Sequence, residues 1–193
     1  FALAGLVPWA FFANGVTVGA ASLVANELLV RRVYFPRLVI PAGAVLAGAL
    51  DAAISMILLL LLALALGVAP SATWLLAPLF LALTALTSLG VAIILAALNV
   101  RYRDVQHIVP FFVQLLMFSS PIVYSSTILP QPWRTLYALN PVVGIIEGLR
   151  WSIFGAGAPP VTALALSVVV TAGILALDRP ALAPLDDRVH ELA

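Results

Sequence analysis

The hydrophobic positions of this chain gather in five long runs, which are separated by short polar stretches. The runs cover approximately residues 1–25, 41–68, 73–98, 105–124 and 159–177. About 20 apolar residues in a helix cross a hydrocarbon core of about 30 Å. Lipid offers no water to open backbone groups, so each run should be helical, and the alternating pattern of a β-barrel is absent. The pattern therefore predicts an all-α polytopic membrane protein with five transmembrane helices.

Arginine residues mark one end of these predicted spans. If the runs cross the membrane alternately, seven of the nine arginines fall on one side, in the loops near residues 26–37 and 98–105 and in the C-terminal tail. The positive-inside rule predicts that this side is cytoplasmic. The first run then enters from outside, and a cytoplasmic N-terminus would need one further span upstream. Because the chain also begins at Phe1 within an apolar run, we expect an N-terminally truncated transmembrane domain over residues 1–178, six spans in the complete subunit, and a cytoplasmic tail over residues 179–193.

Composition excludes several classes of function. The chain is 64% hydrophobic and 9% charged, with a mean hydropathy of +1.17, whereas soluble domains carry roughly 25% charged residues. It has no cysteine, and its net charge of +1 gives no reason to expect nucleic acid as a partner. It also has no lysine, which a Walker A phosphate-binding loop requires, so any ATP-driven work needs a partner subunit.

The acidic and histidine side chains do not converge on a catalytic or metal-binding site. A membrane-embedded enzyme, such as a glycosyl or phosphate transferase, needs clustered carboxylates or a set of metal ligands. Here the acids are isolated, and the two histidines, His107 and His190, lie far apart in the sequence. We therefore predict no catalytic residue, no metal site and no cofactor in this chain.

Four stretches together carry a resemblance to a known family. They read SLVANELLVRRVYFPRLVIP, LNVRYRDVQHIVPFFVQLLMFSSPIVY, ILPQPWRTLYALNP and LNPVVGIIEGLRWSIFG. In this order and spacing they resemble the permease subunit of type-2 ABC exporters that move lipid-linked polysaccharide, such as O-antigen, teichoic acid or capsule. The resemblance runs from Phe1 to about Leu177. The tail departs from the family pattern, because it has two prolines, no aromatic residue and a net negative balance.

The resemblance implies a non-catalytic transport subunit in the bacterial inner, or cytoplasmic, membrane. It implies a homodimer of six-span subunits with short re-entrant helices on the outer side, and two copies of a separate ABC ATPase that hold ATP and magnesium. ATP binding would move the permease helices, and a channel at the dimer interface would pass the lipid-linked glycan. The alternative is a type-2 exporter of drugs or small lipids, which needs one apolar pocket rather than an aromatic and polar lining along a channel.

The loop after the first run resembles the family's coupling segment, which contacts the ATPase. Its charged residues can meet a polar partner surface, its apolar residues at i, i+4 spacing suit docking of a helix in a groove, and Pro36 ends the helix. The alternative is an interfacial helix held by arginine side chains and an aromatic belt. The candidate coupling residues are Asn26, Glu27, Arg31, Arg32, Val33, Tyr34, Phe35, Pro36 and Arg37.

The stretch NVRYRDVQH resembles the family's second cytoplasmic connection. Arg101 and Arg103 could contact a lipid pyrophosphate, because arginine forks fit phosphate. We favour a brace in which these arginines pair with Asp104 and hold the span ends together; the remaining explanation is positive-inside anchoring with Asp104 at a helix N-terminus. His107 is expected only to form a hydrogen bond. The candidate residues of this motif are Asn99, Arg101, Tyr102, Arg103 and Asp104.

The region from Ser125 to Gly157 is too polar for a span and too apolar for an ordinary loop. Its second half predicts a helix, with Asn140 as N-cap and Pro141 at the first helical position. Glu147 and Arg150 are three residues apart and can pair. The resemblance implies that this region gates the exit, while an aromatic interface belt explains its rings at least as well. The candidate residues of the outer gate and glycan path are Trp133, Tyr137, Asn140, Pro141, Glu147, Arg150, Trp151 and Phe154.

Three further features lie inside the predicted helices. Asp51 is about ten residues into the second run, where a charge is costly and usually faces protein or water. We expect it near the cytoplasmic third of the span, hydrogen-bonded to a neighbouring helix or in contact with the conduit, which argues against a purely structural anchor. Gly15 and Gly19, and likewise Gly144 and Gly148, are four residues apart and permit close helix approach.

Overall fold

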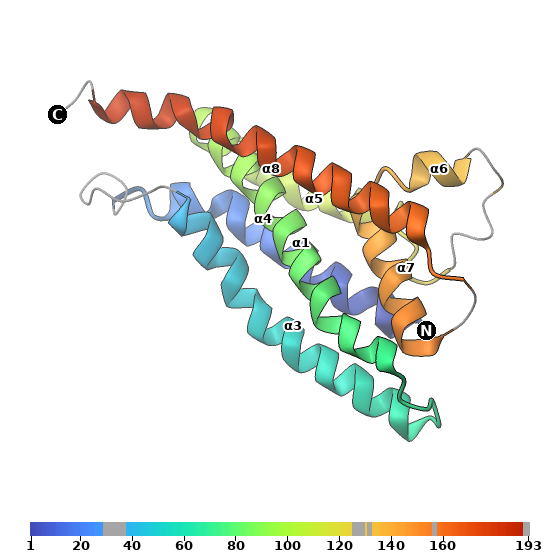
Figure 1. Cartoon of the computed structure of the whole chain (residues 1–193). Helices are drawn as coiled ribbons and strands as arrows, with labels where there is room; N and C mark the ends of the chain where they lie inside the picture. The colour runs from blue at the N-terminus through green and yellow to red at the C-terminus, as the bar shows by residue number, and fades with distance from the viewer. Residues whose placement is uncertain (29–37, 125–129, 131–132, 156–157, 191–193) are drawn as a thin grey trace.

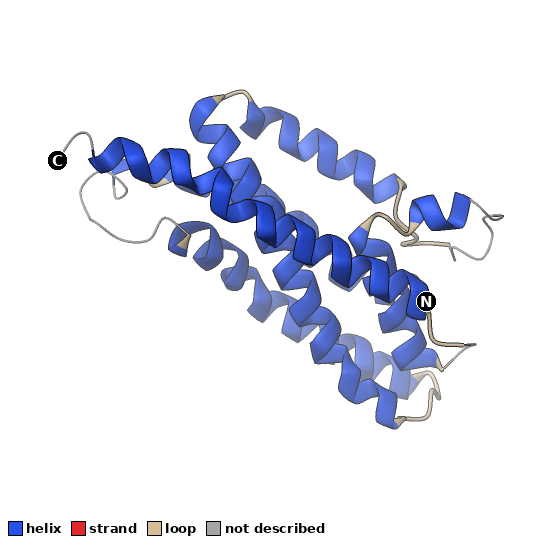
Figure 2. Cartoon of the chain, turned by 45° about the horizontal axis from the view of Figure 1, so that its top comes forward, coloured by secondary structure: helices blue, strands red, loops and turns tan. Residues whose placement is uncertain are grey.

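The chain folds into a bundle of helices (Figure 1, Figure 2). The computed structural model describes residues 1–28, 38–124, 130, 133–155 and 158–190, with the main chain alone for residues 134–135 and 179–190. Within these ranges the chain forms helices, turns and bends but no strand, which confirms the predicted all-α class. The helices are α1 Ala2–Ala25, α3 Val39–Ala65, the 3₁₀ helix η1 Ala72–Leu76, α4 Ala77–Arg101, α5 Val105–Phe118, α6 Trp133–Tyr137, α7 Pro141–Phe154 and α8 Val161–His190.

Four of the described segments are long and apolar enough to cross a membrane. They are Ala2–Ala25, Val39–Ala65, Ala72–Arg101 and Val161–Asp178. The remaining predicted run, over residues 105–124, forms the shorter helix α5 of 14 residues. At 1.5 Å per residue α5 is about 21 Å long, less than a hydrocarbon core of about 30 Å. Its early end has a local cause, because Pro121 disfavours helical geometry at the residue before it.

The last helix continues beyond the end that hydropathy predicts. We expected the apolar run to end near Leu177 and a separate tail to follow. The apolar part does end at Asp178, but the helix α8 runs on to His190. The two boundaries differ because hydropathy reports where lipid ends, whereas a helix satisfies its own backbone hydrogen bonds in lipid and in water.

Helix α1 lies at the centre of the bundle, where it packs against α3, α4, α5 and α7. Its contact with α4 depends on the two glycines that the sequence singles out. A methyl group added at Gly19 would come within 2.6 Å of the Cβ of Ala92, and one added at Gly15 would overlap Ser88. The predicted close approach along this face of α1 is therefore confirmed, and it is made with α4.

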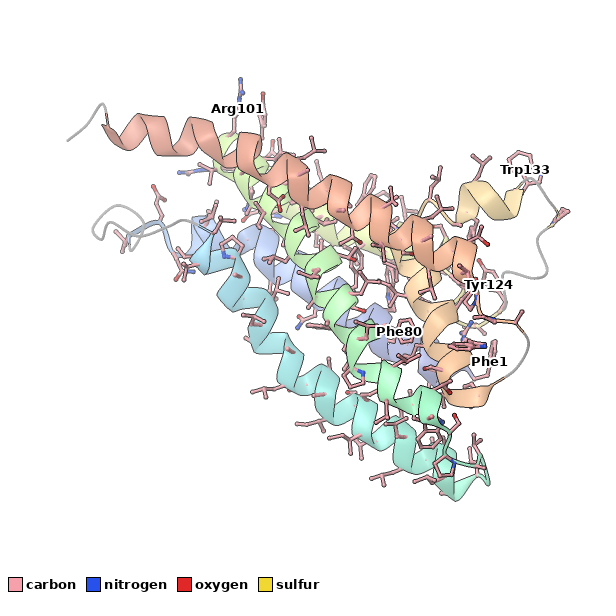
Figure 3. The ribbon with its side chains drawn as sticks, in the orientation of Figure 1. Phe1, Phe80, Arg101, Tyr124 and Trp133 are labelled. Atoms are coloured by element: carbon pink, nitrogen blue, oxygen red, sulfur yellow. The ribbon has the colours of Figure 1, made fainter. Side chains whose placement is uncertain are left out.

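The two ends of the bundle differ in the residues that they carry. Figure 3 shows Arg101 at one end, and Phe1, Tyr124 and Trp133 at the other. The C-terminus of α8 points to the end of the bundle that carries Arg101, while α6 and α7 lie at the end of the N-terminus (Figure 1, Figure 3). This arrangement agrees with the alternate crossing that we inferred from the arginines.

The outer face of α3 carries apolar side chains that the rest of the chain leaves uncovered. Large aliphatic side chains on this face are 56% to 73% exposed, and they include Leu46, Leu50, Ile54, Ile57, Leu58 and Leu61. The core lies instead around α1, α4 and α7, where Ile93, Ile145, Ile146 and Leu149 are at most 2% exposed. An apolar perimeter around a packed interior is the arrangement expected of a chain whose solvent is lipid.

Candidate functional site

Asn99 joins three helices at the end of the bundle that carries Arg101. This side chain lies in the last turn of α4 and has no exposed surface. Its Nδ2 donates a hydrogen bond to the carbonyl oxygen of Ala20 in α1, at 3.1 Å. Its Oδ1 accepts one from the main-chain N–H of Gln106 in α5, at 3.2 Å. Asn99 therefore connects α1, α4 and the start of α5, and its burial removes it from any contact with a lipid head group.

The same side chain performs the task of an N-cap for α5. The residue in the N-cap position is Asp104, but its side chain makes no capping hydrogen bond. The first N–H groups of a helix have no partner within the helix and need an acceptor from elsewhere. Asn99 supplies one to Gln106, the second residue of α5. A residue from the preceding helix thus replaces the local cap.

The brace between arginine and Asp104 that we favoured is wrong for the chain as the structure describes it. Arg101, Arg103 and Asp104 are all exposed, and among the described residues no ion pair joins them. Arg101 instead lies over the ring of Tyr102, 5.4 Å from its centroid. Exposed ion pairs contribute about 0–1 kcal/mol, so solvent competes easily for these groups. At this end the described hydrogen bonds between helices come from Asn99 and not from an arginine pair.

His107 and Gln106 form a small polar pair at the start of α5. Gln106 Nε2 lies 3.3 Å from His107 Nε2, and both side chains are exposed. The expected hydrogen bond of His107 is therefore present.

Most of the predicted coupling loop lies outside the described residues. This applies to Arg31, Arg32, Val33, Tyr34, Phe35, Pro36 and Arg37. At its start, Asn26 ends α1 by donating from its Nδ2 to the carbonyl oxygen of Ser22, at 2.9 Å. Glu27, which follows, is half-buried. The described residues thus place the start of this loop at the end of α1, the central helix.

Helix α7 begins and ends where the sequence predicts. Asn140 is its N-cap and accepts a hydrogen bond from the main-chain N–H of Val142, at 3.1 Å; Pro141 is the first helical residue. The helix ends at Phe154, before Gly155, which adopts the left-handed conformation with a φ of +60°. The Asn140 Nδ2 also donates to Ser120 Oγ, at 3.0 Å. The cap therefore fixes the segment after α5 as well as the start of α7.

The two predicted glycines of α7 do permit close approach, each to a different neighbour. A methyl group at Gly144 would overlap the carbonyl oxygen of Ala163 in α8, and one at Gly148 would overlap the ring of Phe80 in α4. Figure 3 shows Phe80 between α4 and α7. Helix α7 is therefore wedged against two of the long helices.

Arg150 is buried beneath the segment that follows α5. Its side chain is 6% exposed. Its Nη1 donates to the carbonyl oxygen of Tyr124, at 3.0 Å, and its Nη2 donates to that of Ile122. Burial lowers the pKa of the Arg150 guanidinium, and the nearby Glu147 carboxylate opposes this shift. The predicted interaction with Glu147 is thus electrostatic support, while the hydrogen bonds of the fork go to main chain.

The predicted aromatic side chains of the outer end do not form one cluster. Tyr137 pairs with Tyr124 through their hydroxyl groups, 2.6 Å apart. Burial, and then this hydrogen bond, raise the pKa of Tyr137, so it stays protonated. Trp133 is 63% exposed at the tip of α6 (Figure 3). Phe154 lies 6.5 Å from Phe1, measured between ring centroids. Within the described residues, Tyr137, Phe154 and Trp133 thus belong to separate contacts.

Sequence reasoning missed two contributors at this end, Tyr124 and Trp74. Trp74, in η1, donates from Nε1 to the carbonyl oxygen of Ile153, at 3.0 Å. The neighbouring Thr73 hydroxyl donates to that of Ser152, at 2.6 Å. Together they satisfy main-chain groups in the last turn of α7. No local signal reveals such partners, because they are 79 residues apart in the sequence.

Asp51 lies in a groove between α1 and α3. The groove holds about 450 Å³ and is mainly apolar, with Asn14, Asp51 and Ser55 as its polar lining residues. Counted from Val39, Asp51 is residue 13 of the 27 in α3, so it lies near mid-span and not in the cytoplasmic third. Its side chain is exposed, and within the described part of the chain nothing donates to it. The expected hydrogen bond to a neighbouring helix is therefore wrong.

Carboxylate and imidazole side chains do not gather in the described ranges. No group of three or more His, Cys, Asp or Glu side chains lies close enough to hold a metal ion there. The polar side chains buried inside the bundle serve helix packing instead: the hydroxyl groups of Thr87 in α4 and Thr171 in α8 lie 2.8 Å apart.

Comparisons with known proteins bear on the whole arrangement. A family model described as ABC-2 type transporter matches residues 1–154, from the first residue to the end of α7. The O-antigen export system permease protein RfbA of Klebsiella pneumoniae is 30% identical over 152 residues, which is 78% of this chain and 58% of that protein. The protein of the same name from Myxococcus xanthus is 34% identical over 175 residues, 88% of this chain and 67% of that protein. The chain thus spans less than two thirds of the length of the Klebsiella relative.

Proposed function

This chain belongs to the ABC-2 type transporter family, and from that premise we propose that it is the transmembrane subunit of an exporter that moves lipid-linked polysaccharide out of a bacterial cell. O-antigen is the first candidate cargo, with teichoic acid or capsule as related ones. The subunit would sit in the inner, or cytoplasmic, membrane as a multi-pass protein. The observation that carries the proposal is the similarity to an O-antigen export permease over 88% of the chain at 34% identity.

The proposed partner is a separate ATPase subunit, present in two copies. The chain has no lysine and so cannot contain a Walker A loop. We propose that ATP and magnesium are held by the partner, and that this chain hydrolyses nothing. The loop after α1 is the proposed contact, because it follows the central helix, so a push on this loop would reach α3, α4, α5 and α7 through α1.

The proposed conduit lies between two copies of the chain. The groove between α1 and α3 is mainly apolar and holds about 450 Å³, which suits a drug-sized molecule and not a threaded glycan. A polymer path therefore needs surfaces from a second subunit. The exposed arginines near Asp104 would meet the phosphate groups of the lipid carrier at the entry, since arginine forks fit phosphate.

The coupling contact is tested by purifying the complete protein in mild detergent and identifying what is bound to it. We expect a soluble subunit with a Walker A motif, and we expect Val33→Asp with Phe35→Asp to release it. The matched control is Ala69→Asp, an exposed change in the turn before η1 at the other end of the bundle, which should leave the subunit bound. A protein that purifies alone, with no effect of either change, would refute the ATPase partnership.

The groove at Asp51 favours the alternative, an exporter of drugs or small lipids, because it is a single apolar pocket with one carboxylate. Filling the groove with Gly48→Leu tests whether the polysaccharide passes through it. If the cargo passes between subunits as polysaccharide, surface glycan persists while the groove is blocked. Loss of glycan export together with unchanged assembly would contradict a conduit that lies only between the two subunits. In a strain that lacks the gene, absence of any effect on surface glycan would count against polysaccharide export itself.

A further inference from the structure

The segment from Ser119 to Tyr124 has no helix of its own and is held in place by side chains. Its main chain bends after α5, with a turn hydrogen bond from the N–H of Ile122 to the carbonyl oxygen of Ser120, at 2.8 Å. Two side chains of the N-cap and body of α7 reach it: Asn140 contacts Ser120, and Arg150 contacts Ile122 and Tyr124. We refer to residues 119–124 as the outer segment. Its position thus depends on α7.

The guanidinium of Arg150 fits this task in a way that another cation would not. Two different nitrogens of one planar group donate to two carbonyl oxygens that are two residues apart in the chain. The fork is rigid, so binding both carbonyls fixes the direction of the segment as well as its distance from α7. A lysine ammonium is a single point of charge and cannot hold both carbonyls in this geometry.

The surroundings of Arg150 show that the packing accommodates this contact. A methyl group added at Gly5 in α1 would come within 2.6 Å of Arg150 Nη2 and 2.9 Å of the carbonyl oxygen of Ile122. The ring of Phe1 lies against the guanidinium, with its centroid 3.9 Å from Cζ. The Nε of Arg150 is buried and has no hydrogen-bond partner. A buried charge with one donor unsatisfied is costly, so the two carbonyl bonds are what keep the side chain in this place.

We propose that Arg150 is the positioning residue of the outer end: its fork attaches the outer segment to α7, so that the two move as one body. The outer segment then leaves its place against α1 only together with α7, which is itself wedged against α4 and α8 by Gly148 and Gly144. That the outer end opens to release cargo rests on the proposed export function. The attachment itself does not, because it is a property of the resting chain.

The buried side chain of Ile122 provides the reporter for a test. Ile122 is 7% exposed and packs in a cluster with Trp9 and Ile146. The chain contains no cysteine, so Ile122→Cys creates a single thiol once any cysteine outside these residues has been removed. The rate at which N-ethylmaleimide labels this thiol, in the complete protein without ATP or glycan, measures how often the outer segment separates from the bundle.

We expect Arg150→Met to raise the labelling rate of the cysteine at position 122 by about tenfold or more. Arg150→Lys should give an intermediate rate, because one carbonyl can still be bound. A change below about twofold in both variants would overturn the proposal, and so would a lysine variant that labels as slowly as the parent, since the fork would then be unnecessary. If Arg150→Met yields no folded protein, the comparison between Arg150→Lys and the parent decides.

A second thiol separates local release from general loosening. Ile93, in α4, is 2% exposed. It precedes the outer segment in the sequence by 26 residues, counted from Ile93 to Ser119. In the background Ile93→Cys, both Arg150 variants should leave labelling unchanged. A parallel rise at position 93 would show that Arg150 merely stabilises the whole fold, which contradicts a positioning role. Because no transport is measured, a negative result here leaves the export function standing, and a failure of export leaves this result standing.

Discussion

Replacement of Asn99 by alanine is the sharpest test of how the helices are joined at the charged end. The change removes two hydrogen bonds at once, one from Asn99 Nδ2 to the carbonyl oxygen of Ala20 and one from the N–H of Gln106 to Asn99 Oδ1. The side chain has no exposed surface, so water does not reach its partners in the folded chain. We therefore expect a loss of stability without any loss of charge.

The magnitude follows from the two bonds taken separately. The carbonyl of Ala20 lies within α1 and keeps its helical partner, so loss of the Asn99 donor removes about 1 kcal/mol, the net value of one hydrogen bond. The N–H of Gln106 lies in the first turn of α5 and has no helical partner, so its loss resembles removal of an N-cap, about 1 kcal/mol. Together we expect a decrease of about 2 kcal/mol in the free energy of unfolding. Asn99→Asp should cost more, because a carboxylate would face the Ala20 oxygen.

The assay is equilibrium unfolding of the purified protein in mixed detergent, followed by the fluorescence of its four tryptophans. The matched control is Gln106→Ala, because the bond to Asn99 comes from the main-chain N–H and survives loss of the Gln106 side chain. The control should lie within about 0.5 kcal/mol of the parent, as surface changes usually do. If Asn99→Ala also lies within that range, Asn99 does not hold the helices together and the reasoning is refuted.

Three further changes test the packing within the bundle by the same measurement. Gly144→Ala should lower the free energy of unfolding by about 1–3 kcal/mol, because the methyl group would overlap α8. Its control is Gly43→Ala, where the added methyl group meets nothing within 4 Å and should raise the free energy of unfolding by about 0.5–1 kcal/mol. Equal shifts in the two variants would contradict the close packing at Gly144. Thr87→Val combined with Thr171→Val should cost about 0.6 kcal/mol, the average for a hydrogen bond between membrane helices, and an energy above about 2 kcal/mol would show that more than this bond is lost. Asp51→Asn should leave stability unchanged or raise it, since the described residues give this carboxylate no donor; a decrease above about 1 kcal/mol would reveal a partner for Asp51 from another molecule.

Local signals in the sequence were sufficient to predict α7. Its N-cap, its first proline and its terminating glycine are adjacent in sequence to the helix that they delimit. The residues that cause the helix to begin and end can therefore be recognised in the sequence. The all-α class and the two unlike ends were predictable for a related reason. Continuous apolar runs and the placement of arginine reflect the bilayer, which acts on every segment in the same way.

Contacts between segments that are distant in the sequence could not be predicted. Asn99 reads as part of a charged loop motif, yet it is buried because Ala20, 79 residues earlier, lies beside it. Arg150 was expected to lie where a glycan could touch it, yet its Nη1 and Nη2 donate to carbonyls 26 and 28 residues away. Hydropathy also overestimated the length of α5, since Ser119 to Pro121 end the helix inside an apolar run. For Asn99 and Arg150 the partner carries no signal in its own neighbourhood, whereas Pro121 is a local signal that hydropathy does not register.

The bonds made by Asn99 and Arg150 have a consequence for how this protein can diverge. Both side chains bind main-chain groups, which every residue except proline at the N–H provides. Gln106, Ile122 and Tyr124 can therefore be exchanged without altering the hydrogen bonds that their backbones make. Asn99 and Arg150 have no such freedom, because the chemistry resides in their side chains alone. Only the residue that supplies the side chain is thus restricted in identity. The segments at both ends of the bundle can change their surfaces to suit a different cargo or partner, while the hydrogen bonds from Asn99 and Arg150 stay the same.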